Sequence, residues 1–142
     1  MADLPSSLTL EVATPLGMAL SVQTDSVQVP SAAGEFGVLP GHVPLLAALK
    51  PGILSYRHDG QMLRAAIGGG YAEATADRVR LITEFFLKRE DINVEQAQKD
   101  LADAEARMKT SQAATVDVEF QEIERELQWA QARLQLAGGE TN

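Results

Sequence analysis

Cysteine is absent from the sequence of 142 residues, which excludes disulfide bonds and metal sites built from thiolates. Histidine is scarce, and neither His42 nor His58 has a second histidine or a carboxylate at the spacing of a zinc motif. No serine occupies the centre of a G-x-S-x-G motif. The common signatures of zinc enzymes and serine hydrolases are therefore missing, and we expect no catalytic, cofactor-binding or metal-binding residues.

Long hydrophobic runs are also absent. The most apolar stretch, VPLLAALKPGIL, is interrupted by Lys50 and Pro51 and is shorter than the roughly 20 residues that a membrane-spanning helix needs. The first residues, MADLPSSLTLEV, have neither the basic start nor the apolar core of a secretory signal. We therefore expect membrane association only through a partner.

Basic residues are fewer than acidic residues, and most of the difference lies in the second part of the chain. The net charge is −8, with 8 acidic and 7 basic residues in 1–89 but 12 acidic and 5 basic residues in 90–142. A negative chain is repelled by nucleic acid and by anionic lipid, so neither is expected as a partner. The second part of the chain presents a different kind of surface from the first.

Hydrophobic residues recur with a period of two in the first part of the chain. Leu8, Leu10 and Val12 alternate with polar residues, as do Met18, Leu20 and Val22, which predicts strands with one face on a core. Further short runs, separated by turn residues such as Asp59-Gly60, are Val27–Val29, Phe36–Leu39, Ile53–Arg57, Met62–Ile67, Tyr71–Ala74 and Arg78–Ile82. Many short strands at close spacing predict an all-β sandwich or barrel over residues 1–89.

Three consecutive glycines, Gly68–Gly70, precede one of these strands. They lack the G-x-x-x-x-G-K frame of a phosphate-binding loop, and no helical pattern follows them. Glycine also permits another backbone to pass close by, or a bulge to form. We therefore predict a close backbone approach or a bulge here rather than a nucleotide site.

After Arg89 the hydrophobic period changes to that of a helix. Asn93, followed by Gln96, predicts a helix start in which Asn93 caps an amide and Gln96 reaches back to it. The apolar stripes consist of Val94, Ala97, Leu101, Ala104 and Met108, then Val116, Phe120, Ile123, Leu127, Ala130, Leu134 and Ala137. With the polar link Lys109–Thr115 and an end at Gly138-Gly139, they predict an antiparallel helix hairpin over residues 90–142. Because the stripes are narrow and rich in alanine, we expect the hairpin to be held loosely and to be able to move.

The segment Gly34–Leu46, GEFGVLPGHVPLL, combines glycines with prolines that restrict the backbone. It predicts a rigid, shaped loop. Such a loop serves either as a corner of a sandwich or as a docking surface, in which Glu35 and His42 would be the polar contact groups. Spacing alone leaves both interpretations open.

The run GEFGVLPGHVPLLAALKPGIL, preceded by VQVPSAA and followed by IGGGYAEA, resembles the epsilon subunit of bacterial rotary ATP synthases. The resemblance extends over nearly the whole chain. It implies a mainly β fold with added α structure: an N-terminal β sandwich of about ten strands in two sheets, followed by a C-terminal antiparallel helix hairpin. It also implies a non-catalytic subunit of the central stalk that couples rotation of the c ring to ATP synthesis.

The resemblance further implies partners and contact residues. The sandwich would bind the gamma subunit and the ring of c subunits at the cytoplasmic face of the bacterial inner membrane. The contact residues that it implies are Ser31, Ala32, Ala33, Glu35, His42 and Thr14. Ser31–Glu35 would touch the c ring, His42 would lie near the junction of ring and gamma, and Thr14 would face the same junction. The hairpin can lie on the sandwich or extend along gamma, where it can reach the alpha/beta hexamer and restrain ATP hydrolysis.

Two departures from the family pattern alter these expectations. Some members bind ATP through an I-D-x-x-R-A motif, but here Asn93 replaces the aspartate and Gln96 the arginine. Because the cation that would pair with phosphate is missing, we expect weak or absent ATP binding. Inhibition in the family uses basic hairpin residues against an acidic loop of the catalytic beta subunit, whereas residues 117–142 hold only Arg125 and Arg133 against six acids. We therefore expect no strong inhibition by this route.

Two other functions are compatible with the sequence. The first is a free-standing β-sandwich adaptor with a helical tail, which co-purification with gamma would distinguish from a stalk subunit. The second is a small hydrolase that uses His42 with Glu35 or Asp25, because the members of a catalytic triad need not be neighbours in sequence. Turnover by the isolated chain that is lost in His42→Ala would identify such an enzyme.

Overall fold

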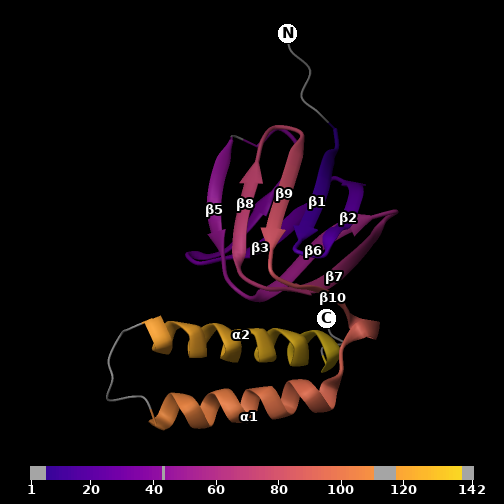
Figure 1. The fold of residues 1–142 in the computed structure, drawn as a ribbon. Coiled ribbons are helices and arrows are strands. Elements are labelled where there is room, and N and C mark those ends of the chain that lie inside the picture. The colour runs from indigo at the N-terminus through magenta and orange to yellow at the C-terminus, as the bar shows by residue number, and fades with distance from the viewer. Residues whose placement is uncertain (1–5, 43, 111–117, 139–142) are drawn as a thin grey trace.

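The computed structural model describes residues 6–42, 44–110 and 118–138, which form a ten-stranded β sandwich followed by two antiparallel helices (Figure 1). The strands are β1 (Leu8–Thr14), β2 (Gly17–Thr24), β3 (Val27–Ser31), β4 (Gly34–Val38), β5 (Leu45–Leu49), β6 (Gly52–His58), β7 (Gln61–Ile67), β8 (Gly70–Ala74), β9 (Arg78–Thr83) and β10 (Phe86–Lys88). This architecture confirms the predicted fold class.

The strands form one continuous sheet that folds over into two layers. Its order is β10-β7-β6-β3-β5-β8-β9-β1-β2, with β4 attached to β3. The layers meet where β3 passes to β5, through the single pair Ser31 and Leu49. All pairs are antiparallel except β1 with β9. The layer β5-β8-β9-β1-β2 therefore has an outer face that the other layer does not cover.

The core lies between the two layers and follows from the alternation in the sequence. Leu8, Leu10 and Val12 of β1 are fully buried, whereas the residues between them are half-buried. The other members of the core are Val27, Val29, Val38, Leu49, Leu54, Tyr56, Ile67, Ala72, Ala74, Val79 and Leu81. Its small number of aromatic residues means that interdigitated aliphatic side chains supply most of the buried apolar area.

Two glycine-containing segments behave as their sequences predict. The β6–β7 hairpin turns at Asp59 and Gly60, which both have left-handed backbones with φ of 53° and 77°. At the glycine triplet, Gly70 has φ of 148°, and a Cβ there would overlap the carbonyl oxygen of Ile82. The close backbone approach predicted for Gly68–Gly70 is therefore confirmed, and the triplet leads into strand β8.

The structure differs from the sequence prediction at three places in the sandwich. Leu45–Leu49 forms strand β5 and Phe86–Lys88 forms β10, although neither segment was predicted as a strand. Met18 was expected on the same face as Leu20 and Val22, but it is 59% exposed. A β-bulge causes this difference, because Val12 pairs with Leu20 while the next residue, Ala13, pairs with Met18.

The helices are α1 (Val94–Thr110) and α2 (Val118–Gly138), preceded by the short 3-10 helix η1 (Arg89–Asp91). Asn93 Oδ1 accepts a hydrogen bond of 3.0 Å from the backbone N of Gln96, which confirms the predicted cap. The Gln96 side chain does not reach back; it donates instead to Asp100 Oδ1 at 2.8 Å. Residues 111–117, which include most of the predicted link and Val116, lie outside the described residues, as does Gly139.

Candidate protein-interaction site

The tip of the β3–β4 hairpin contains most of the contact residues that the resemblance implies. Its turn residues are Ala32 and Ala33, and both side chains are exposed. Ser31 is 5% exposed, and its Oγ accepts a hydrogen bond of 3.1 Å from Ala33 N and donates to the carbonyl oxygen of Gly34. Ser31 therefore shapes the turn from inside, whereas Ala32, Ala33 and Glu35 present their side chains to solvent.

Backbone restrictions on both sides of this tip make it stiff. Pro30 is fully buried, and a Cβ on Gly52 would lie 2.7 Å from the Cβ of Pro30. Gly34 has φ of 121°, in a region that favours glycine. Ala32 N donates a hydrogen bond of 2.9 Å to Ala48 O on β5. The tip is therefore anchored to both layers, which gives the predicted rigidity a structural cause.

His42 lies in the loop after β4, where backbone hydrogen bonds position it. Gly41 N donates to Ala76 O at 2.7 Å, and His42 N donates to Leu39 O at 3.1 Å. Ala76 belongs to the turn between β8 and β9, so this turn fixes the loop. The side chain of His42 is half-buried.

Thr14 ends β1 and organises the turn to β2. Its Oγ1 accepts a hydrogen bond of 3.2 Å from Leu16 N and donates to Gly17 O at 3.3 Å. The turn presents Leu16, which is 99% exposed. Thr14 is itself half-buried. Its hydroxyl shapes the turn, and it can also face a partner.

The strand pairings show which contact residues lie together. Leu49 at the end of β5 pairs with Gly70 at the start of β8, and Gly70 pairs with Thr83 at the end of β9. Because β9 also pairs with β1, these strand ends lie beside the end of β1. The same strand ends meet the β3–β4 tip. Thr14 and the segment 31–35 therefore occupy one end of this layer. His42 lies at the other end, a strand length of roughly 15 Å away. The structure does not bring His42 together with Thr14, although the resemblance placed both near one junction.

The residues of the hypothetical hydrolase are also apart. Glu35 is at the β3–β4 tip, opposite His42, and Asp25 lies 3.6 Å from Arg57 in an exposed ion pair. Within the described residues, no group of three or more histidine, aspartate or glutamate side chains could hold a metal ion. The geometry therefore places Glu35 at the other end of the layer from His42, and Asp25 beside Arg57.

The helix hairpin is held together by its apolar stripe. Ala97, Ala104, Ile123 and Ala130 are buried, and Val94 is 42% exposed at the start of α1. The remaining predicted stripe residues are half-buried: Leu101, Met108, Phe120, Leu127, Leu134 and Ala137. Small alanines at the centre allow α1 and α2 to approach closely, so the hairpin buries only a modest apolar area.

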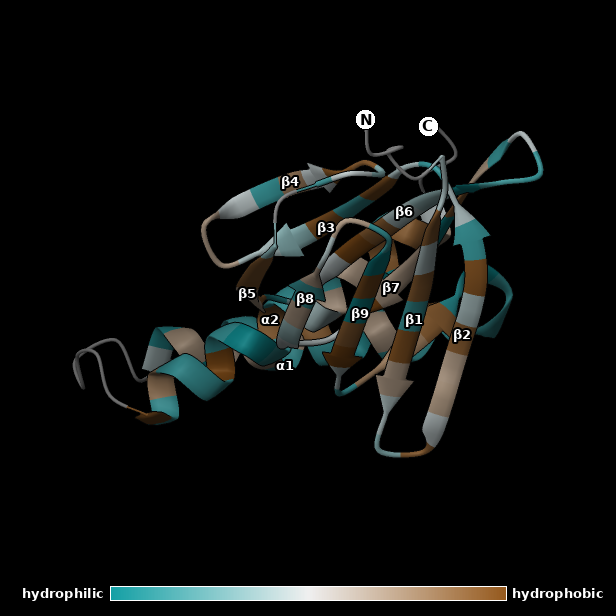
Figure 2. Cartoon of the chain, turned by 90° about the horizontal axis from the view of Figure 1, so that it is seen from above, coloured by the Kyte–Doolittle hydropathy of each residue, from teal (hydrophilic) through white to brown (hydrophobic). Residues whose placement is uncertain are grey.

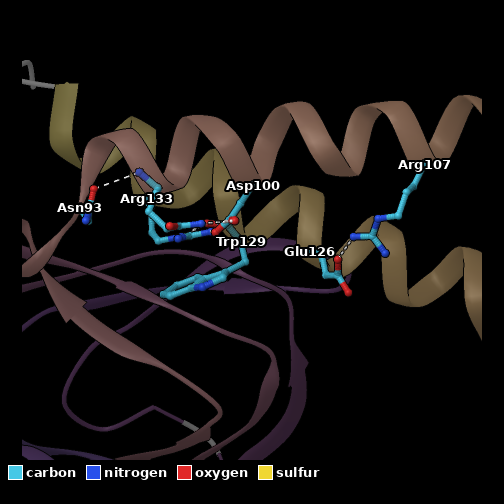
Figure 3. A network of polar contacts seen from close by, with 7 residues as sticks. Asn93, Asp100, Arg107, Glu126, Trp129 and Arg133 are labelled. Carbon is cyan, nitrogen blue, oxygen red and sulfur yellow. Dashed lines mark hydrogen bonds and ion pairs between the residues drawn. The ribbon is translucent and has the colours of Figure 1, made fainter.

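A polar cluster, missed by the sequence analysis, joins the two helices to each other and to the sandwich (Figure 3). Arg133 of α2 donates to Asp100 of α1, with Nη2 3.0 Å from Oδ2, and its side chain is 10% exposed. Its guanidinium lies 5.2 Å from the centre of the Trp129 ring, and Trp129 stacks on Phe85 at 4.8 Å. The only relevant sequence signal was Arg133 four residues after Trp129 on the buried side of a helix.

Electrostatics favour the charged form of this cluster. The hydrogen bond from Gln96 holds the pKa of Asp100 below its usual value, and the hydrogen bond and charge of Arg133 add to this effect. Nearer the other end of the hairpin, Arg107 pairs with Glu126 of α2 and with Asp103 of its own helix. The carboxylates therefore raise the pKa of Arg107, with Glu126 the main cause.

The hairpin contacts the sandwich mainly through α2 (Figure 1). Ala132 and Leu136 bury themselves against Ala66, with Ile53 and Trp129 at the edge of this cluster. Arg89 Nε also donates to the carbonyl oxygen of Leu136 at 2.9 Å. This small interface is compatible with the expected loose attachment, and mobility of the hairpin stays a prediction.

A cleft of about 520 Å³ separates α2 from the loop that follows β9. Its charged lining residues are Glu84, Asp100, Asp103, Glu122 and Glu126, with Arg125 and Arg133. An anionic ligand would meet five carboxylates and two guanidinium groups.

None of the described helices combines the length and apolarity needed to cross a bilayer.

Family models and relatives cover both parts of the chain. Residues 7–89 match the model described as ATP synthase, Delta/Epsilon chain, beta-sandwich domain, and residues 90–138 match its long alpha-helix domain. ATP synthase epsilon chain 2 of Syntrophotalea carbinolica is 37% identical over 92% of this chain and 94% of its own length. The epsilon chain of Geobacter sp. strain M21 is 39% identical, over 94% and 96% of the two chains.

The fold also resembles a chain in a solved assembly. A chain of the Euglena gracilis mitochondrial ATP synthase, in a structure titled OSCP/F1/c-ring, superposes with a TM-score of 0.76 at 24% identity. The superposition covers 92% of this chain and 81% of the Euglena chain. At this identity the likeness concerns the fold, in which a sandwich is followed by two helices.

Proposed function

The chain belongs to the ATP synthase delta/epsilon chain family, and we propose that it is a rotor subunit of the central stalk, which transmits c-ring rotation to ATP synthesis. It is a non-catalytic subunit of the ATP synthase F1 sector. The observation that carries the proposal is the match over both domains, at 37–39% identity to bacterial epsilon chains that it covers almost end to end.

In this proposal the sandwich binds the gamma subunit and stands on the c ring. Ala32, Ala33 and Glu35 at the exposed β3–β4 tip would meet the ring, and the buried Ser31 would keep the tip in shape. The anchoring of the tip to Pro30 and Ala48 supports this role. A contact that is already ordered loses little conformational entropy on binding, and it yields little under torque.

His42 and Thr14 are proposed contacts of the stalk at the two ends of the same layer. A gamma subunit lying along the outer face of the layer can approach both, whereas the c ring would meet only the end that carries Thr14 and the β3–β4 tip. The proton-driven rotor would then hold this chain at the cytoplasmic face of the bacterial inner membrane. The attachment to the membrane is peripheral in this proposal and depends on these partners.

The hairpin is a weak candidate for an inhibitor that acts on the alpha/beta hexamer. Residues 117–142 carry two basic residues, and Arg133 is buried against Asp100 in the folded hairpin. Extension of the hairpin would release Arg133, but six acidic residues accompany it and Arg125. Like charges would oppose a contact between this helix and the acidic loop of the catalytic beta subunit. We therefore propose a regulatory hairpin with little inhibitory strength.

ATP binding is proposed to be weak or absent. Asn93 and Gln96 stand where the ATP-binding motif has its aspartate and arginine, and both bond within the helix. The nearby cleft holds more carboxylates than guanidinium groups, so it does not fit a polyphosphate. Calorimetric titration of the full chain with Mg-ATP tests this proposal, and micromolar affinity would contradict it.

The experiment that tests the stalk function is reconstitution. The full chain, the gamma subunit and the c ring from the same source are purified separately, mixed and passed over a sizing column. We expect a complex of all three and no ATP turnover by the chain alone. A chain that elutes apart from both partners, or that hydrolyses a substrate by itself, would reject the proposal in favour of the adaptor or the hydrolase.

A further inference from the structure

The contact between the hairpin and the sandwich is concentrated in the second half of α2. Trp129, Ala132 and Leu136 pack there against Ala66 and its neighbours. Earlier in α2, the cleft of about 520 Å³ separates the helix from the loop that follows β9. Where α1 ends and α2 begins, the hairpin extends beyond the strands (Figure 2). The sandwich can therefore stabilise that far end only through the pairing of the two helices.

Trp129 rests on a ring that the sandwich holds in a fixed position. Phe85 stacks with Trp129 at a ring-centre distance of 4.8 Å and an interplanar angle of 16°. The carbonyl oxygen of Phe85 accepts a hydrogen bond of 3.1 Å from Gly68 N, and a Cβ on Gly68 would lie 2.9 Å from the Phe85 ring. Gly68 thus leaves room for this ring. The stack is therefore a specific contact, which a displaced α2 would lose.

Arg133 connects this stack to α1. Its guanidinium lies 5.2 Å from the centre of the Trp129 ring, and its Nε donates to Trp129 O at 3.3 Å. Its Nη2 lies 3.0 Å from Asp100 Oδ2, while Gln96 Nε2 donates to the other carboxylate oxygen at 2.8 Å. Figure 3 shows Asp100, Arg133 and Trp129 lying together. The connected series, which we call the latch, consists of Gln96, Asp100, Arg133, Trp129 and Phe85.

Burial makes the two halves of the latch depend on each other. The side chain of Arg133 is 10% exposed, so without Asp100 it would be a nearly buried charge that had lost its counter-charge. Breaking a buried ion pair by removing one partner is strongly destabilising. If α1 moved away, Arg133 would have to turn toward water, and the same stretch of helix carries Trp129 and Ala132. If α2 left Phe85, the ion pair would lose the rings that shield it from water.

We propose that the latch makes closure of the hairpin and its docking on the sandwich one cooperative event, so that α2 occupies the sandwich only while it is paired with α1. The chain then has two states, one closed and docked and the other open and undocked. A closed hairpin that swings away as a rigid arm is not one of them. A partner that binds one helix would thereby release the other. This inference concerns the chain alone and goes beyond the proposed function.

Hydrogen exchange of the full chain tests the latch from the side of the sandwich. Phe85→Leu removes the stack and leaves the residues of α1 and α2 unchanged. We expect amide exchange in both helices to become faster by the same factor, at least about fivefold, although the substituted ring belongs to the sandwich. The matched control is Tyr71→Leu, at an aromatic residue of β8 that is 60% exposed, which should leave both helices protected. Wild-type protection of α1 in Phe85→Leu would overturn the inference.

Fluorescence tests the latch from the side of α1, because Trp129 is the only tryptophan in the chain. Asp100→Asn preserves the size of the side chain and removes its charge. We expect the emission of Trp129 to shift to longer wavelength and its quenching by acrylamide to rise at least about twofold, since loss of the ion pair should free the ring. Asp103→Asn is the control, because Asp103 pairs with Arg107 of its own helix. Unchanged emission in Asp100→Asn would contradict the coupling.

The double variant distinguishes one cooperative unit from two separate contacts. If the latch is one unit, Phe85→Leu together with Asp100→Asn should exchange within about twofold of the faster single variant. Independent contacts would instead multiply the two factors, and that result would reject the latch. Protection of β8 and β9 reports whether each variant is folded. Neither gamma nor the c ring enters these measurements, so failure of the stalk function would leave their outcome unchanged.

Discussion

Arg133 of α2 and Asp100 of α1 meet across the hairpin, with Nη2 3.0 Å from Oδ2, in a segment whose apolar contacts are mostly alanine. The same guanidinium lies over Trp129, which stacks on Phe85 of the sandwich. One ion pair is therefore linked to both the closure of the hairpin and its attachment to the sandwich.

Replacing Arg133 should loosen the hairpin more than its size suggests. Arg133→Met keeps an apolar stem but removes a charge-assisted hydrogen bond and the contact over Trp129, at a cost of about 1–3 kcal/mol. We expect faster amide hydrogen exchange along α2 with little change in β8 and β9. The control is Arg125→Met, at an exposed position of the same helix. Equal protection in wild type and Arg133→Met would contradict a stabilising role for the pair.

Acid should weaken this pair in a defined direction. The pKa of Asp100 is lowered in the folded chain, chiefly by the hydrogen bond from Gln96 and then by Arg133, so its stabilisation is present at neutral pH. It is lost as the pH falls below the ordinary aspartate value of about 3.9 and through the folded value. Thermal melts of wild type and Asp100→Asn should therefore differ at pH 7 and converge at low pH. Asp103→Asn, on the exposed side of α1, serves as the control, and a constant difference at all pH values would refute the assignment.

Glu35 and His42 should act on different partners, because they lie at opposite ends of one layer. Glu35→Lys should weaken binding to the c ring by about tenfold, or about 1.4 kcal/mol, through charge reversal at an exposed tip. His42→Ala should act mainly on gamma. The effects of the two substitutions on the ring–gamma assembly should add, since distant sites without shared partners behave independently. Unchanged assembly of the double variant, measured by sedimentation, would remove both residues from the interface.

Deleting residues 90–142 should change the ATPase rate of the assembled complex by no more than about twofold. The reason is that acidic helices are expected to bind poorly to the acidic loop of the catalytic beta subunit. The measurement compares full-length and truncated chains in the same reconstituted F1. Binding of the truncated chain to gamma provides the control for its folding. A large rise in hydrolysis would show that the hairpin inhibits strongly despite its charge.

The hydrophobic periods predicted the sandwich and the hairpin because burial on one face leaves a period of 2 in strands and 3.6 in helices. They did not predict β5, whose residues LLAAL lack alternation although Leu45 and Leu49 point inward and Leu46 outward. Nor did they predict β10, which has three residues and exists through its pairing with β7.

The contact surfaces were predicted less completely than the fold. The glycines and prolines of Gly34–Leu46 indicated a shaped loop, but sequence order could not show that His42 and Glu35 lie at opposite ends of a layer. Alternation placed Met18 in the core, because a bulge at Ala19 has no signature in a single sequence. Arg133 was counted only as one of two basic residues in 117–142, since its partner Asp100 comes from the other helix.

The parallel pairing of β1 with β9 has a consequence for how the chain is made. Strand β1 pairs with β9, which ends at Thr83. The layer therefore cannot form completely until residues up to Thr83 have been synthesised. The helices follow the strands in the chain, so they can join a body that has already formed. A newly made chain can thus complete its sandwich before its helix hairpin exists.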